Sequence, residues 1–379
     1  RSKELLSLKE SSNNYDKFKS LYSEKLLEET KKVVELQKEC GIDVLVSGEL
    51  NRDNYMSYVA EMVDGIKLLS MNDLKEITTN LESFNKSLEE MDAADNTMNS
   101  PICYSKIDTT RRLNELEVHN FQKFIDRDYK VTLPSPYLLT RSMWLREITG
   151  KVYEGRKELG QDVIELLKNE IRHLVEEGVK IIQIDEPILS EVVFTNEKAD
   201  NSFYWGALSE KVKVDKELKF ARELLEPVLE EIRKHDGVLS IMHVCRGNWT
   251  TDESVLLQGA YDKLGKFFDA LDLDMLALEF STPRAGEVEK LFSNNFLDTR
   301  VMLGFGCVNP RSEVIETPEE IVSRVEELLQ FLPPERIWLN PDCGFATFAK
   351  RPLNPYPIIQ KKLENMVAAS KILREKYCK

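Results

Sequence analysis

The chain has 379 residues, of which 42% are hydrophobic and 31% are charged, and these proportions are typical of a soluble globular protein. Its 52 Lys and Arg residues against 66 Asp and Glu residues give a formal net charge of −14. An acidic surface repels phosphate backbones, so we expect no nucleic-acid partner. No apolar run approaches the roughly 20 residues of a membrane helix, and no secretory signal is visible. Because the six cysteines are far apart and a chain of this size needs no disulfides, we expect a cytoplasmic protein.

Segments of strand length alternate with segments of helical period along the chain. A helix is predicted over residues 17–40, where Gly41 ends it, and a strand over residues 43–47 follows. The later predicted strands are 102–107, 130–133, 180–184, 238–243, 274–279, 301–306 and 336–340. The predicted helices among them are 112–125, 161–177, 218–235, 253–270, 285–293 and 318–332. Thr317, followed by Pro318 and two glutamates, is typical of a helix start.

This alternation predicts the α/β class, with a parallel sheet covered on both faces. The number of units favours a (β/α)₈ TIM barrel over an open sheet, and no glycine-rich phosphate loop opens a predicted helix. We expect one catalytic barrel domain over residues 1–379. Insertions at 67–100 and 194–217, and a proline-rich loop and helix over 344–377, interrupt the pattern. We expect the two insertions and the loop to lie over the barrel mouth, where substrate loops are found.

Four candidate metal ligands follow three of the predicted strands. His243 and Cys245 are two residues apart, so their side chains point to the same side of an extended segment. Glu279 and Cys343 follow two later apolar runs, and the ends of barrel strands meet at one face. Two thiolates, an imidazole and a carboxylate suit Zn²⁺. The alternative is that the cysteines are small packing residues.

Two carboxylates also end predicted strands. Glu49 follows the strand over 43–47, and Asp185 follows the apolar run 181–184. A charged group at the end of a buried strand needs a partner or a ligand. A substrate ammonium group would satisfy it, and a salt bridge to a neighbouring arginine such as Arg52 is the alternative.

These motifs together resemble the cobalamin-independent methionine synthase family, specifically its C-terminal catalytic barrel, from about residue 28 to residue 374. The resemblance is carried by Gly48-Glu49-x-x-Arg52 with Tyr58 and Glu61, Ile182-Gln183-Ile184-Asp185-Glu186-Pro187, His243-x-Cys245, Leu278-Glu279-x-Ser281 and Asn340-Pro341-Asp342-Cys343-Gly344. It implies an S-methyltransferase that methylates the thiol of homocysteine to give methionine. It also implies that His243, Cys245, Glu279 and Cys343 hold one Zn²⁺.

The same resemblance implies that Glu49 and Asp185 bind the amino group of homocysteine and act in catalysis. Arg52, three residues after Glu49, is a further predicted substrate contact. Coordination to Zn²⁺ removes the proton of a thiol at neutral pH. Because four protein ligands fill a tetrahedral site, we expect Glu279, the hardest ligand, to yield its position to the substrate thiol.

Two departures from the family pattern concern the methyl donor. Ser142 stands where the family has a tryptophan that contacts folate, with Trp144 two residues away, and Arg311 stands where it has a proton-donating histidine. Arginine does not release a proton near neutral pH. Only Glu191 matches a folate contact, and the second barrel of the long enzymes has no counterpart. We therefore predict a methylcorrinoid donor, free methylcobalamin or a corrinoid protein, with 5-methyltetrahydrofolate as the alternative.

Three further questions stay open. Arg311 binds either a carboxylate of the substrate or donor, or a helix C-terminus. The family's first Gly-Ser-Phe-Pro strand has no counterpart after Arg1, so we expect it to be missing from the sequence and the strand over 102–107 to lie outside the barrel. Two other functions compete with the leading one. These are zinc-dependent alkyl transfer to another small thiol, and zinc or corrinoid binding without turnover.

Overall fold

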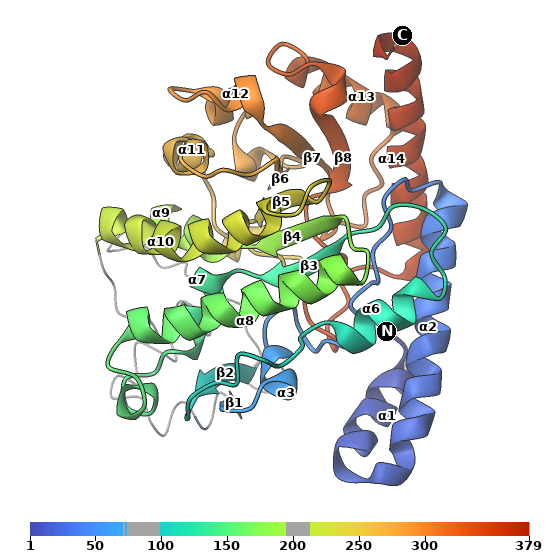
Figure 1. Cartoon of the computed structure of the whole chain (residues 1–379). Coiled ribbons are helices and arrows are strands. Elements are labelled where there is room, and N and C mark those ends of the chain that lie inside the picture. The colour runs from blue at the N-terminus through green and yellow to red at the C-terminus, as the bar shows by residue number, and fades with distance from the viewer. Residues whose placement is uncertain (71–72, 74–98, 195–212, 379) are drawn as a thin grey trace.

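A computed structural model describes residues 1–70, 73, 99–194 and 213–378 (Figure 1). Six parallel strands form its central sheet and follow one another in chain order. They are β3 (Val131–Pro134), β4 (Ile181–Asp185), β5 (Leu239–Val244), β6 (Met275–Glu279), β7 (Met302–Val308) and β8 (Ile337–Pro341). The predicted α/β class is confirmed, and a parallel sheet in chain order with helical connections is the arrangement of a TIM barrel.

The segment 43–47 continues this sheet beyond β3 by a single parallel bridge between Leu45 and Tyr129. The Leu45 amide donates to Asp128 O at 2.9 Å, and the Lys130 amide donates to Leu45 O at 3.0 Å. The predicted strand over 43–47 is therefore reduced to one bridge. Among the described residues, no strand pairs with the outer edge of β8.

Two short strands lie outside the central sheet. β1 (Ile66–Ser70) and β2 (Asn99–Cys103) pair antiparallel with each other. Because β2 covers the start of the strand predicted over 102–107, the expectation that this strand lies outside the barrel is confirmed. The predicted insertions over 67–100 and 194–217 fall largely outside the described residues.

Helices form the outer layer, and most of them cover the sheet (Figure 1). They are α1 (Lys3–Asn14), α2 (Lys19–Cys40), α3 (Val59–Met62), α6 (Glu115–Gln122), α7 (Pro136–Met143), α8 (Arg156–Glu176), α9 (Ile188–Phe194), α10 (Val214–Arg233), α11 (Asp262–Asp269), α12 (Leu297–Arg300), α13 (Pro318–Leu328) and α14 (Tyr356–Tyr377). Gly41 ends α2 with φ 84°, a conformation that favours glycine. Thr317 forms the predicted cap of α13, with its hydroxyl on the Glu320 amide.

Two helix predictions after β5 are wrong. The predicted helix over 253–270 divides into a 3₁₀ turn (Glu253–Val255) and α11, because Gly259 has φ 149° between them. The predicted helix over 285–293 is replaced by two 3₁₀ turns, Pro283–Ala285 and Val288–Phe292. Periodic apolar residues alone do not ensure an α-helix in segments this short.

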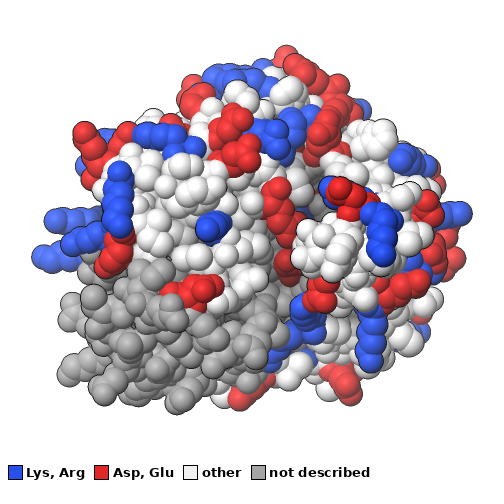
Figure 2. Space-filling model, turned by 90° about the horizontal axis from the view of Figure 1, so that it is seen from below, with Lys and Arg blue, Asp and Glu red and all other residues white. Residues whose placement is uncertain are grey.

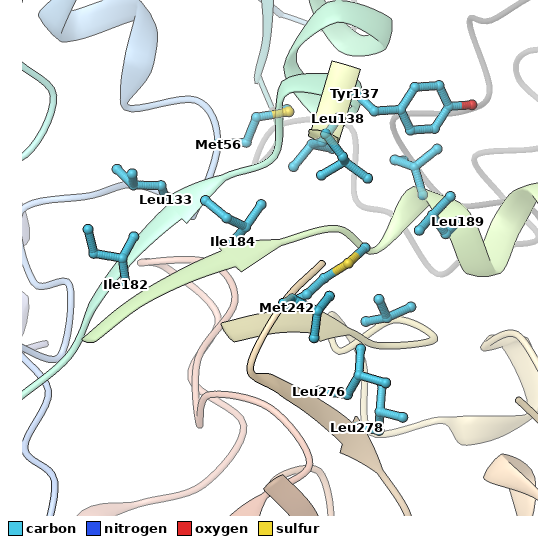
Figure 3. Close-up of a cluster of buried hydrophobic side chains, with 14 of the residues drawn as sticks. Met56, Leu133, Tyr137, Leu138, Ile182, Ile184, Leu189, Met242, Leu276 and Leu278 are labelled. Atoms are coloured by element: carbon cyan, nitrogen blue, oxygen red, sulfur yellow. The ribbon is translucent and has the colours of Figure 1, made fainter. Parts of the chain in front are cut away.

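Alternate residues of each strand build two apolar layers. Ile182 and Ile184 of β4, with Met242 of β5, pack outward against the helices (Figure 3). Ile181 and Ile241 belong to a separate, smaller cluster on the inner face of the sheet. Because side chains alternate along a strand, Asp185 and His243 continue the inner face at the carboxyl ends of β4 and β5. The inner face therefore changes from apolar to polar where the strands end.

The surface carries charges of both signs. Figure 2 shows acidic and basic side chains interspersed over the part of that face not drawn in grey. Among the helices that the structure describes, none combines the length and the apolar character that crossing a membrane requires.

Candidate metal centre and active site

A cavity of about 1290 Å³ runs along the inner face of the sheet and reaches the carboxyl ends of its strands. Helices α2 and α14, which pack side by side, contribute part of its wall (Figure 1). The predicted loop after Cys343 also lines the cavity, through Gly344 to Ala346. Five of the predicted site residues line it: Glu49, Asp185, His243, Cys245 and Cys343. The cavity therefore joins the predicted metal ligands to the predicted ammonium-binding carboxylates.

Three of the predicted metal ligands come together at this edge. The ligand atoms of His243, Cys245 and Cys343 all lie within 4.8 Å of one another, and His243 Nε2 is 3.5 Å from Cys343 Sγ. His243 Nδ1 is 2.9 Å from the Ala277 carbonyl oxygen, which can only accept a hydrogen bond. Nδ1 therefore carries a proton, and Nε2 faces the two sulfur atoms as the ligand atom. This donor set suits a soft divalent metal ion.

The protonation of these three groups is coupled. A hydrogen bond from Cys343, opposed by burial and aided by His243, lowers the pKa of Cys245 to about 5. Burial and the neighbouring Cys245 thiolate raise the pKa of Cys343. Burial disfavours the imidazolium form, but the hydrogen bond and charge of Cys245 outweigh it and raise the pKa of His243 to about 9. A metal ion bound here would therefore displace protons from His243 and Cys343.

Glu279, the fourth predicted ligand, lies beside this group but is not one of its three mutually close members. Its Oε1 is 3.5 Å from Cys343 Sγ, and its side chain is 1% exposed. Burial would raise the pKa of this carboxyl, but Arg284, Arg311 and Arg246 outweigh burial and hold the pKa below its usual value. Metal ligation by Glu279 stays a prediction.

Glu49 reaches the cavity from a strained turn. Gly48 and Glu49 have φ values of 79° and 52°, and the left-handed region is costly for glutamate. The Glu49 carboxylate accepts a hydrogen bond from the Thr132 hydroxyl and lies 3.3 Å from Arg52 Nη1. Burial opposes ionisation, but Arg52 and Thr132 outweigh it and lower the pKa of Glu49. An ionised carboxylate is therefore presented to the cavity.

Asp185 is oriented by two residues, Gln183 and Lys130, for which no functional role was predicted. Gln183 Nε2 donates to Asp185 Oδ1 at 2.7 Å, and Lys130 Nζ donates to Gln183 Oε1 at 2.6 Å. Burial, reinforced by Glu49, raises the pKa of Asp185 to about 6. The sequence did contain a signal for Gln183, which is the polar residue in the apolar run 181–184. A buried polar side chain needs a hydrogen-bond partner, so a contact with a neighbouring polar group could have been predicted.

Three other predicted contacts do not line the cavity. Arg52 is bound to Glu117 beneath Glu49, and Arg311 lies behind Glu279. Glu191 of α9 accepts a hydrogen bond from Arg141 at 2.9 Å. Substrate contacts of these residues stay predictions. In the structure, their charged groups are engaged by other side chains of the protein.

Comparison with known proteins identifies the family. Residues 3–219 and 242–372 match the family described as the catalytic domain of cobalamin-independent synthase. The chain belongs to this family. The predicted family and the predicted methyltransferase class are therefore confirmed.

Individual relatives of the cobalamin-independent synthase family are distant. The chain is 28% identical to a methionine synthase of Sulfurisphaera tokodaii, over 88% of this chain and 78% of that protein. It is 24% identical to the 5-methyltetrahydropteroyltriglutamate–homocysteine methyltransferase of Thermotoga maritima, over 95% of this chain and 41% of that protein. A B12-independent methionine synthase from Shewanella sp. W3-18-1, in complex with selenomethionine, superimposes with a TM-score of 0.70 at 18% identity. That match covers 94% of this chain and 90% of the other, and it supports the predicted barrel fold.

These comparisons correct the predicted methyl donor. The family is described as cobalamin-independent, and the Thermotoga relatives are named for a folate donor, so the alternative is better supported than a methylcorrinoid. The corrinoid prediction depended on Ser142 and Arg311. Ser142 is buried in α7 and donates to Leu138 O at 2.6 Å, and neither it nor Arg311 lines the cavity. Both positions therefore carry little information about the donor.

Proposed function

We propose that this chain is a zinc-dependent methyltransferase that transfers a methyl group to the thiol of homocysteine, giving methionine. The observation that supports it most is the opening of the His243–Cys245–Cys343 group into the same cavity as Glu49 and Asp185. A thiol-binding metal centre and a pair of carboxylates match two groups of an amino-acid thiol, its sulfur and its ammonium group. We further propose that residues 1–379 act as one catalytic domain.

Each side of the cavity has a chemical task. Bound Zn²⁺ would hold the substrate sulfur as a thiolate at neutral pH. His243 Nε2 and the sulfur atoms of Cys245 and Cys343 would hold the ion. Glu49 is ionised before the substrate arrives, and the positive charge of the substrate ammonium group would favour ionisation of Asp185 as well. The Lys130–Gln183 pair fixes the direction of the Asp185 carboxylate.

We propose a methylated folate as the donor. The relatives named for 5-methyltetrahydropteroyltriglutamate support this choice. The cavity of about 1290 Å³ is not confined to Glu49, Asp185 and the metal ligands, because it also runs along the inner face of the sheet to residues that precede the strands. A thiolate that attacks the methyl carbon in line needs both partners in one enclosure.

The direct test measures methionine formation by zinc-loaded protein from homocysteine, with 5-methyltetrahydrofolate or its triglutamate as the only methyl source. We expect methionine, and we expect Cys343→Ser to remove both bound zinc and turnover. Cys40→Ala is the matched control, because Cys40 is buried beside α14, where its Sγ is 3.8 Å from Gln360 O. Absence of methionine with the zinc-loaded protein would contradict the proposal, and turnover with methylcobalamin alone would restore the corrinoid donor.

A second measurement separates homocysteine from other small thiols. Glu49→Gln and Asp185→Asn should raise the KM for homocysteine by at least about tenfold, the effect of losing one charge-assisted contact. The same variants should leave the reaction of a thiol without an ammonium group unchanged. Equal effects on both thiols would favour alkyl transfer to a different thiol.

A further inference from the structure

Two neutral polar side chains, Thr132 of β3 and Gln183 of β4, face the cavity from neighbouring strands. They are partners in the parallel register, and both line the cavity on the inner face of the sheet. β3 also pairs with the segment 43–47, which leads to Glu49, and β4 ends at Asp185. The two strands therefore bring one neutral side chain toward each carboxylate of the candidate ammonium site.

Each of these side chains donates a hydrogen bond to one oxygen of one carboxylate. The Thr132 hydroxyl donates to Glu49 Oε1, and Gln183 Nε2 donates to Asp185 Oδ1 at 2.7 Å. Within the described part of the chain, no group donates a hydrogen bond to Glu49 Oε2 or to Asp185 Oδ2. Each carboxylate therefore has one oxygen that is held and one that can accept from a ligand.

Two cations determine the direction of these hydrogen bonds. Arg52 Nη1 donates to Thr132 Oγ1 at 3.1 Å, so the single hydroxyl proton is left for the carboxylate. Lys130 Nζ donates to Gln183 Oε1 at 2.6 Å, so the amide nitrogen faces the carboxylate at the end of β4. Guanidinium and ammonium groups can only donate. Thr132 and Gln183 therefore both present a donor to their carboxylate.

The orientation of each carboxylate decides how well it can accept from an ammonium group. The last torsion of a glutamate or aspartate side chain is soft, with a broad range of favoured angles. A donor fixed on one oxygen sets the plane of the carboxylate and thereby the direction of the second oxygen. Because a pre-oriented group loses less conformational freedom when a ligand binds, such a donor strengthens binding without touching the ligand.

We propose that Thr132 and Gln183 are positioning residues of the ammonium site, each fixing one carboxylate so that its second oxygen is directed at the ammonium group of an amino-acid thiol. This inference rests on the proposed function, because it deepens the roles of Glu49 and Asp185. It makes selectivity for a thiol with a primary ammonium group depend on two neutral side chains that need no contact with the substrate.

The test compares two thiols by calorimetry, with zinc-loaded protein and without a methyl donor. The first is homocysteine, and the second is 4-mercaptobutyrate, which has hydrogen in place of the amino group. Selectivity is the dissociation constant of 4-mercaptobutyrate divided by that of homocysteine. We expect Thr132→Val and Gln183→Met each to lower this ratio about three- to tenfold, the effect of one lost hydrogen bond. Thr132→Ser, which keeps the hydroxyl, should restore most of the ratio.

Matched controls remove the same chemical groups elsewhere. The Thr30 hydroxyl donates to Leu26 O at 2.8 Å, and Gln122 Nε2 donates to Glu177 O at 2.8 Å. Neither Thr30 nor Gln122 lines the cavity. Thr30→Val and Gln122→Met should change the ratio by less than about twofold, the usual independence of separate sites. A general loss of stability would weaken binding of both thiols and leave the ratio unchanged.

Double variants show whether each side chain acts through its own carboxylate. With Glu49→Gln already present, adding Thr132→Val should change the ratio by less than about twofold, whereas adding Gln183→Met should keep its full effect. With Asp185→Asn present, the two results should be exchanged. Each single variant tests one carboxylate, so if one of them does not fold, the other still decides the question.

An unchanged ratio in Thr132→Val and Gln183→Met would overturn this inference alone if Glu49→Gln and Asp185→Asn still lower it. An unchanged ratio in all four variants would overturn the ammonium site, and with it both proposals. Absence of homocysteine binding by the unmodified chain would do the same. The expected ratios without methionine formation would support the inference and contradict only the proposed reaction.

Discussion

Replacement of Arg52 by methionine tests how the candidate ammonium site is supported. The Arg52 side chain is 1% exposed, and its guanidinium forms two hydrogen bonds with Glu117, at 2.8 and 3.0 Å. It also contacts the hydroxyl and carbonyl oxygens of Thr132, each at 3.1 Å, and lies 4.4 Å from the centre of the Tyr58 ring. Arg52→Met keeps an unbranched apolar stem but removes the guanidinium, so the buried Glu117 carboxylate loses this cation.

Removing one partner of a buried ion pair costs about 3–5 kcal/mol, because the other charge stays buried without compensation. For a chain of this length, the average unfolding entropy per residue converts that loss into a fall of roughly 4–6 °C in Tm. Glu49 loses the same cation at 3.3 Å, so we also expect a higher KM for homocysteine. Calorimetry and denaturant titration measure the first effect, and steady-state kinetics measures the second.

A matched pair and a double variant make this prediction specific. Arg222 and Glu226 form an exposed pair on α10 at 2.5 Å, and Arg222→Met should change the free energy of unfolding by less than about 1 kcal/mol. The Arg52→Met/Glu117→Gln double variant removes both charges of this ion pair, so neither is left buried alone. Much of the free energy of unfolding that Arg52→Met loses should therefore be recovered. A loss below about 1 kcal/mol in Arg52→Met would refute the reasoning.

Two further predictions concern stability. Burial opposes ionisation of Glu217, but a hydrogen bond from Arg156 at 2.6 Å and other polar contacts outweigh burial and lower the pKa of Glu217. The ionised Glu217 therefore stabilises the fold fully above about pH 4.3, the pKa of a free glutamate, and this stabilisation is lost as the pH falls through the lowered pKa. Denaturant titration should show the difference between the unmodified chain and Glu217→Gln shrinking from pH 7 to pH 3, and a constant difference would contradict the pairing. In Gly306→Ala, the new Cβ would lie 2.5 Å from both Leu278 O and Asp342 Oδ1, so β6 and the segment after β8 must both move away from β7. We expect a loss of about 1–3 kcal/mol. Gly155→Ala, where no atom lies within 4 Å of the added Cβ, is the control, and an equal loss there would show that crowding is not the cause.

The sequence by itself determined most of the central sheet. Strands β3 to β8 lie within two residues of their predicted bounds, because strands buried on both faces leave apolar runs bounded by turns. The order of these runs also placed His243, Cys245 and Cys343 at one edge, since the carboxyl ends of barrel strands meet there. The same reasoning overestimated the segment 43–47, where the apolar pattern is present but only Leu45 forms a bridge.

Only the tertiary structure decided what surrounds the ligands. The sequence shows an arginine at position 311, but not that its guanidinium reaches Glu279, 32 residues earlier, together with Arg246 and Arg284. It likewise shows Lys130 and Gln183 without showing that they orient Asp185. The pattern of apolar residues along one segment indicates which of its side chains face the core. The direction of a long polar side chain depends instead on which acceptors other segments bring within its reach, and that is settled only when the strands are assembled.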